Sequence, residues 1–141
     1  MRERPLALSA LLIVTTIAAG LTIRLVPLGL PNAIVKYGGS LLWALMIYWT
    51  VSSVRPLWRL ARSALVSSAI ALCVELFKLY HAPLLDALRL TLPGKLLLGR
   101  VFSLWDLVAY AAAIVAGVLA DRALQSNVLL VCAANTSSAN R

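Results

Sequence analysis

The residues best suited to chemistry are charged side chains placed inside apolar stretches. Glu75 and Lys78 interrupt the apolar run 63–80, and Asp106 interrupts the run 101–120. A charge at the centre of a membrane helix costs about 2.5–3.5 kcal/mol, so an intramembrane acid is a candidate for ligand binding, ion transfer or catalysis. Glu75 and Lys78 are also three residues apart, which allows a simple neutralising pair on one helix face.

Other polar residues are predicted to gather around these three. Four membrane crossings would bring the end of the run 63–80 and the starts of the runs 37–54 and 101–120 to one membrane surface. We therefore expect one ligand-binding cluster there. Its candidate residues are Tyr37, Glu75, Lys78, Asp86, Arg89, Arg100, Asp106 and Tyr110. The alternative is a purely structural set of ion pairs, in which Asp106 caps its helix or pairs with Arg100.

Two stripes of small and polar residues support a cluster between helices. Asp106, Tyr110, Ala113 and Gly117 recur at spacings of 4, 3 and 4, which places them on one helix face. Ser68, Ala71, Glu75 and Lys78 do the same at spacings of 3, 4 and 3. Small residues allow helices to approach closely, and polar groups avoid lipid, so both stripes are predicted to face other helices.

Four apolar segments must position these residues, and they cover about 5–23, 37–54, 63–80 and 101–120. Each is close to the roughly 17–25 residues that a helix needs to cross the hydrocarbon layer. The chain of 141 residues is 62% hydrophobic and 13% charged, far more apolar than a soluble domain. The sequence predicts an all-α integral membrane protein with four transmembrane helices in a single domain, 1–122. A poorly ordered tail, 123–141, is expected to follow.

The connection 82–100 differs from an ordinary loop. Leucines alternate there with Asp86, Arg89 and Lys95, and Pro93-Gly94 marks a turn. The segment is too polar and broken to cross a membrane, yet too apolar to stay in water. We expect an interfacial or re-entrant segment between the third and fourth transmembrane helices.

Charge indicates orientation rather than a nucleic-acid partner. The chain has 13 basic and 5 acidic residues, and the basic ones lie at the ends of the apolar runs, as in cytoplasmic loops. The strongest local signal is Arg55, Arg59 and Arg62 in one short loop without an acid. It favours an N-in, C-in topology. The four tryptophans, Trp43 among them, are typical of membrane-interface anchors.

No cofactor or metal is predicted. Cys73 and Cys132 give no disulfide framework, and a single histidine cannot build a metal cluster with them. The sequence also lacks a Gly-x-Ser-x-Gly elbow, a His-Glu-x-x-His motif and a phosphate-binding loop. Whether the protein is an enzyme stays open.

Four short motifs, read together, resemble a known family. They are KYGGSLLWA at 36–44, ELFKLYHAP at 75–83, LDALRLT at 85–91 and LGRVFSLWDLVAY at 98–110. Over roughly 20–120 the chain resembles an uncharacterised bacterial membrane family, domain of unknown function 2809. The order of acid, loop arginine and second acid is also distantly similar to VanZ-like proteins, which are associated with teicoplanin resistance. The family pattern has an acid where Ser40 stands, glutamine where Lys78 stands, and glycine near Ala111–Ala113.

The resemblance implies a small multi-pass protein of the bacterial inner (plasma) membrane. We expect a non-enzymatic envelope protein whose outward-facing polar pocket binds a lipid head group, a cell-wall precursor or a partner protein. One alternative is a small ion- or proton-coupled transporter in which Glu75 and Asp106 titrate. Another is an intramembrane enzyme acting on a lipid-linked substrate, with Arg89 or Arg100 holding a phosphate. The expected partner is the lipid bilayer, with no nucleic acid, and a homo-oligomer is compatible with the sequence.

Overall fold

The computed structural model describes residues 5–27, 29–91, 93–94 and 102–138, with side-chain burial given as far as residue 126. These residues form helices and connections and no strand. The helices are α1 (Leu6–Leu25), α2 (Asn32–Val54), α3 (Leu60–Phe77), α4 (Pro83–Leu90) and α6 (Leu104–Ser138). In α1, α2, α3 and the Leu104–Ser126 part of α6, length and composition suffice for membrane spans. The prediction of an all-α protein with four transmembrane helices is confirmed.

Prolines mark several helix boundaries. Pro5 and Pro31 directly precede α1 and α2, and Pro83 is the first residue of α4. Proline suits the start of a helix because its fixed φ is already helical and its missing N–H is not needed there. This explains why α2 begins at Asn32, five residues before the predicted start at Tyr37.

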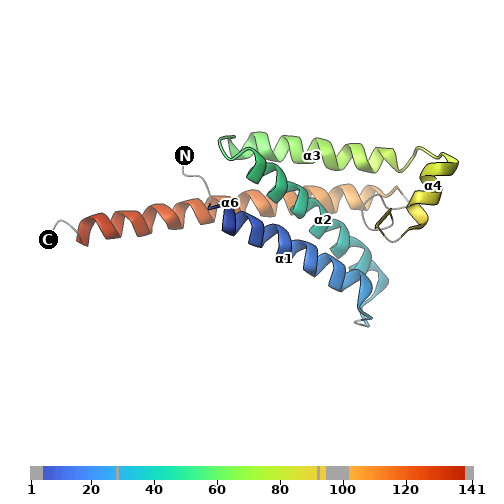
Figure 1. Ribbon diagram of the computed structural model, residues 1–141, viewed down its shortest axis with the longest axis horizontal. Coiled ribbons are helices and arrows are strands. Elements are labelled where there is room, and N and C mark those ends of the chain that lie inside the picture. Colours follow the sequence, from blue (N-terminus) through green and yellow to red (C-terminus); the bar gives the residue numbers. More distant parts are fainter. Residues whose placement is uncertain (1–4, 28, 92, 95–101, 139–141) are drawn as a thin grey trace.

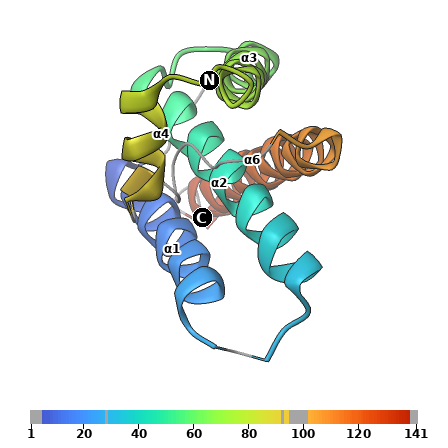
Figure 2. The same ribbon diagram turned by 90° about the vertical axis from the view of Figure 1, so that its right-hand side faces the viewer.

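The transmembrane helices are arranged around α2, which packs against α1, α3 and α6, while α3 also packs against α6. Figures 1 and 2 show α3 and α1 on different sides of α2, with α4 lying across one end of the bundle. We call this end the α4 end and the other, near the α2–α3 turn, the opposite end. The interior combines polar and apolar side chains, and the outside is largely apolar. Buried serines, acids and small residues join the helices beside aromatic clusters, while many leucines, such as Leu65 and Leu84, are exposed. Such an outer surface suits lipid.

Two predictions from the sequence concern the segment before α6 and the C-terminal part of α6. α4 has eight residues, too short to cross a bilayer, and fits the interfacial segment expected between the third and fourth spans. α6 continues past residue 122 to Ser138 and extends beyond the bundle (Figure 1), and the poor order of the tail 123–141 stays a prediction. The physical reason is simple. No proline or glycine follows Gly117, so nothing in the sequence breaks the helix.

Candidate functional site

A network of charged and polar side chains is buried where α2, α3 and α6 meet at the α4 end. Its centre is Glu75, whose side chain is fully buried. Glu75 Oε2 accepts hydrogen bonds from Lys78 Nζ at 2.5 Å and from the Tyr110 hydroxyl at 2.8 Å. Glu75 Oε1 accepts the backbone N–H of Ser103 at 2.9 Å. Both carboxylate oxygens therefore have protein partners, which a buried carboxylate requires.

Lys78 connects this carboxylate to a second one. Its Nζ lies 3.5 Å from Asp106 Oδ2 and 3.4 Å from the Tyr110 hydroxyl. Asp106 Oδ1 in turn accepts a hydrogen bond of 3.0 Å from Ser40 Oγ on α2. One ammonium thus bridges two buried carboxylates on different helices. We call Ser40, Glu75, Lys78, Asp106 and Tyr110 the ionic network.

The α6 stripe behaves as predicted. Asp106, Tyr110, Ala113 and Gly117 are all buried, and they face α2 and α3. The sequence offered Asp106 as a cap of α6. In the structure, its carboxylate contacts Ser40 on α2 and Lys78 at the end of α3.

The α3 stripe needs one correction. Ala71, Glu75 and Lys78 are buried as predicted, but Ser68 is exposed and Ser67 is fully buried instead. Adjacent helix positions differ by about 100° around the axis, so the stripe runs through 67 and not 68. Close approach to α6 comes from Ala71, which shares a core cluster with Tyr110 and Ala113.

Asp86 and Arg89 form a second, separate group. Arg89 is 2% exposed, and its guanidinium donates to the carbonyl oxygens of Phe77 at 2.7 Å and Tyr80 at 2.9 Å. Asp86 Oδ1 accepts a third bond at 3.1 Å. The last carbonyls of a helix lack partners within it, so Arg89 caps the end of α3 and fixes α4 beside it.

The remaining predicted site residues lie apart from the network. Tyr37 is half-buried, and Lys36 Nζ lies 5.2 Å from the centre of its ring. Among the described residues, no hydrogen bond joins Tyr37 to the ionic network. Arg100 lies outside the described residues. The structure therefore brings together four of the eight predicted residues, with Ser40 as a fifth member.

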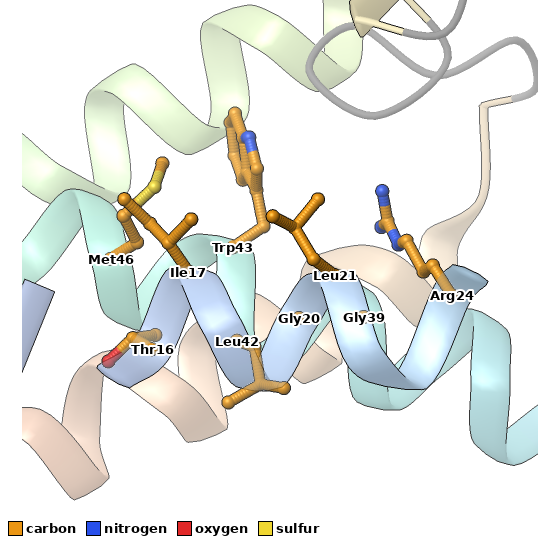
Figure 3. Close-up of a pocket in the computed structure, with 9 residues that line it drawn as sticks. All are labelled: Thr16, Ile17, Gly20, Leu21, Arg24, Gly39, Leu42, Trp43 and Met46. Atoms are coloured by element: carbon orange, nitrogen blue, oxygen red, sulfur yellow. The ribbon is translucent and has the colours of Figure 1, made fainter. Parts of the chain in front are cut away.

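A groove between α1 and α2 borders the network, and its lining was not predicted as a site (Figure 3). Its volume is about 90 Å³. Most of its lining is apolar, and the residues are Thr16, Ile17, Gly20, Leu21, Arg24, Gly39, Leu42, Trp43 and Met46. We call it the α1/α2 groove. The Trp43 ring lies 5.6 Å from the Tyr110 ring, so this tryptophan packs on the ionic network rather than acting only as an interface anchor.

Another buried pair occupies the opposite end of the bundle. The Tyr48 hydroxyl donates to Asp121 Oδ2 at 3.0 Å, and both side chains are buried. Asp121 also lines a cavity of about 140 Å³. A signal for Asp121 was present in the sequence, because it extends the α6 stripe by another four residues after Gly117.

Comparison with known proteins identifies the family of the chain, a family without an assigned function. No solved structure matches the chain. The family model described as "Protein of unknown function (DUF2809)" matches residues 29–114, which is more than half of the chain. The match contains the whole ionic network and α4, and it ends before Asp121. The chain therefore belongs to the DUF2809 family of proteins of unknown function.

Proposed function

We propose that this multi-pass membrane protein is a non-enzymatic binder of an anionic lipid. The lipid's head group lies at the α4 end, and part of its apolar chain lies in the α1/α2 groove. The observation that carries this proposal is the composition of the groove. Apolar side chains line most of its length, and the ends of Arg24 and Trp43 supply nitrogen donors beside them. A lipid with an acidic head group complements this lining, because its apolar chain matches the apolar side chains and its anionic head group matches the nitrogen donors.

The two polar side chains both favour an anion. A guanidinium group such as that of Arg24 has several N–H donors in one plane, which suits a phosphate or carboxylate. The indole N–H of Trp43 is a donor only. Its Nε1 is buried and has no hydrogen-bond partner among the described residues. Figure 3 shows both nitrogen-bearing ends on the same side of the groove, with Leu21 between them.

The ionic network gives this site a rigid wall. It joins α2, α3 and α6 through hydrogen bonds, and Trp43 packs on its Tyr110. In this proposal Glu75, Lys78, Asp106 and Tyr110 are positioning residues, because their polar atoms are largely satisfied by one another. Direct ligand contact by Asp86, Arg89, Arg100 and Tyr37 stays a prediction. So do the outward direction of the site, the bacterial inner membrane and the VanZ-like choice of a cell-wall precursor as ligand.

A pair of adjacent glycines allows a matched test. A Cβ at Gly39 would collide with the Arg24 guanidinium, whereas a Cβ at Gly38 has its nearest neighbour, Ile23 Cδ1, at 4.0 Å. Gly39→Ala should therefore displace the end of Arg24 without breaking α2, and Gly38→Ala should change nothing. Retention of phosphatidylglycerol against phosphatidylcholine is measured by native mass spectrometry of the purified full chain.

The wild type should retain phosphatidylglycerol in preference to phosphatidylcholine. Arg24→Gln and Gly39→Ala should each weaken this retention by about tenfold, which corresponds to losing one charge-assisted contact. Gly38→Ala should behave like the wild type. Equal retention of the two lipids by the wild type, or full retention by Gly39→Ala, would overturn the proposal.

One observation favours a second candidate, ion- or proton-coupled transport. Glu75 and Asp106 are both buried and share the single ammonium of Lys78. Shared buried carboxylates are common in proton and cation pathways. Protein reconstituted in liposomes would then show a proton- or sodium-dependent flux that Glu75→Gln abolishes, and Gly39→Ala would leave this flux intact.

A further inference from the structure

Another cavity of the α4 end lies outside both the ionic network and the α1/α2 groove. It holds about 300 Å³ and is lined by His81, Asp86, Arg89 and Leu90. We call it the α4 cavity. Asp86, Arg89 and Leu90 belong to α4, and His81 lies in the connection between α3 and α4. Small-molecule sites begin at about this volume, so the α4 cavity has room for one small polar group.

The two opposite charges of the α4 cavity offset each other. Arg89 Nη1 lies 3.1 Å from Asp86 Oδ1, and the same guanidinium donates to the carbonyl oxygens of Phe77 and Tyr80. An anion that entered the cavity would meet the carboxylate, and a cation would meet the guanidinium. Each attraction is therefore opposed by a repulsion. The lining favours a neutral polar ligand over an ion.

All three polar side chains keep some hydrogen-bonding capacity. Arg89 is buried, and its Nε has no hydrogen-bond partner among the described residues. The Asp86 side chain is 45% exposed, and its one hydrogen bond within the described part of the chain uses Oδ1. His81 Nδ1 lies 3.1 Å from the Leu79 carbonyl oxygen, which can only accept. Nδ1 therefore carries the hydrogen, and Nε2 of the neutral ring is an acceptor. The α4 cavity thus offers one donor and two acceptors.

The hydroxyl groups of a sugar complement this lining. Each hydroxyl can donate one hydrogen bond and accept others. Within one ring, a hydroxyl can accept from Arg89 Nε while its neighbours donate to Asp86 Oδ2 and His81 Nε2. A phosphate offers mainly acceptors and an ammonium only donors, so neither satisfies the donor and the acceptors together.

The outer face of α4 indicates that such a sugar belongs to a lipid. Leu84 and Leu88 are four residues apart on one helix face, and they are 77% and 51% exposed. α4 lies across the end of the bundle (Figure 2), where leucines on a short helix can enter the apolar side of the membrane interface. We infer that the α4 cavity binds the sugar head group of a neutral glycolipid, independently of the anionic lipid proposed for the α1/α2 groove.

The test compares lipids that differ in the sugar alone. The full chain is purified in tetraethylene glycol monooctyl ether, a detergent without sugar. It is then exposed to an equimolar mixture of monoglucosyldiacylglycerol, diacylglycerol and phosphatidylglycerol, and bound lipids are counted by native mass spectrometry. The wild type should retain the glucolipid about tenfold over diacylglycerol. Equimolar methyl glucoside should displace little of it, because it lacks the apolar chains.

Variants that leave the cap on α3 intact identify the site. His81→Phe keeps a ring at an exposed position and removes the acceptor, so it should lower the preference for the glucolipid severalfold. Asp86→Asn can keep its bond to Arg89 through the amide oxygen, and it places a donor where Oδ2 was, so it should lower the preference as well. Ala87→Gln adds a polar side chain on α4 outside the cavity lining and should change nothing. Circular dichroism checks that each variant is folded.

Gly39→Ala separates this inference from the proposed function. It disturbs the α1/α2 groove, so it should lower phosphatidylglycerol retention and keep the glucolipid, whereas His81→Phe should do the reverse. Equal retention of glucolipid and diacylglycerol by the wild type would overturn the inference, as would a folded His81→Phe variant with the full preference. A loss in Ala87→Gln as large as that in His81→Phe would overturn it too. Complete displacement by methyl glucoside would contradict a lipid as the source of the sugar.

Discussion

The two ends of the interface between α2 and α6 bury the same kinds of group and differ in what the described residues place beside the carboxylates. Each end contains a tyrosine hydroxyl bonded to a buried carboxylate, Tyr110 to Glu75 and Tyr48 to Asp121. At the α4 end, the ammonium of Lys78 fills the space beside the carboxylates. At the opposite end, a cavity of about 140 Å³ lies beside Asp121.

This difference shows that a buried acid alone does not identify a binding site. The groups around the acid are equally informative. Lys78 closes the ionic network and joins the helices, whereas Asp121 lines a cavity of about 140 Å³. The ionic network therefore has the character of a structural joint with a groove beside it.

The largest expected effect is loss of the internal cation. Lys78→Met removes the ammonium between Glu75 and Asp106 and leaves buried charge without its partner. Breaking a buried pair in this way typically costs about 3–5 kcal/mol. We expect the free energy of unfolding, measured by SDS titration in mixed micelles with circular dichroism, to fall by that amount.

Asp121→Asn is the matched variant at the opposite end. It keeps the shape of the side chain and its bond to Tyr48, so it should cost much less stability than Lys78→Met. The double variant Glu75→Gln, Lys78→Met should recover part of the loss, because fewer buried charges stay unbalanced. If Lys78→Met proves no worse than Asp121→Asn, the contrast between the two ends fails.

A smaller effect is expected from adding a methyl group at Gly117, where α6 closely approaches Tyr48 of α2. A Cβ at Gly117 would stand 2.6 Å from Tyr48 Cδ1, so Gly117→Ala must push the tyrosine ring aside. Overpacking of this kind costs about 1–3 kcal/mol. At Gly20 a Cβ would meet Leu42 Cβ at 3.8 Å, an ordinary contact. Gly20→Ala should therefore stay within about 1 kcal/mol of the wild type.

The same experiment also separates the two ends. Because Gly117 lies against Tyr48, far from Arg24, Gly117→Ala should lower stability while leaving the groove's preference for an anionic lipid intact. A Gly117→Ala variant with unchanged stability would show that Tyr48 does not depend on this close approach.

The next effect concerns the tyrosine hydroxyls. Tyr110→Phe removes a bond of 2.8 Å to Glu75 inside a closed network, where no water can replace it. Tyr48→Phe removes a bond to a carboxylate that lines a cavity large enough for water. Hydrogen bonds between membrane helices are worth about 0.6–1.7 kcal/mol. We expect Tyr110→Phe near the upper value and Tyr48→Phe near the lower one in the same SDS titration, and the reverse order would contradict the comparison.

Much of this arrangement could be predicted from periodicity. The α6 stripe that begins at Asp106 placed the buried face of α6 correctly, and the order of the spans placed Glu75, Lys78 and Asp106 at one membrane surface. The predicted stripe on α3 missed by one residue at Ser68, because a stripe of four residues does not fix the rotation of a helix more finely than one position.

Other features depend on how elements meet in space. Lys78, just after the last residue of α3, reaches from Glu75 to Asp106 on α6. This reach depends on the approach of α3 to α6, which spacing along one helix does not define. In the sequence, Arg89 was a candidate for phosphate binding. In the structure, its guanidinium donates to carbonyl oxygens at the end of α3, because α4 folds back on α3. Ser40 and Lys78 are two of the three positions at which the sequence analysis expected a departure from the family pattern, and both contact Asp106.

The last prediction concerns which end faces the cell exterior and involves no loss of stability. With Cys73 and Cys132 replaced, single cysteines are placed at Ala87, exposed on α4, and at Leu57, exposed in the α2–α3 turn. The arginines of that turn predict that it lies inside, so a membrane-impermeant maleimide should label Ala87→Cys in intact cells and Leu57→Cys only after lysis.

Labelling of both cysteines, or of neither, in intact cells would contradict a four-helix topology in which these two ends face opposite surfaces. The reverse pattern would keep the fold and exchange the two ends. The anionic-lipid groove would then draw on the cytoplasmic leaflet. Because the groove selects a head group by its own charges, the lipid preference of the purified protein should be the same in either orientation.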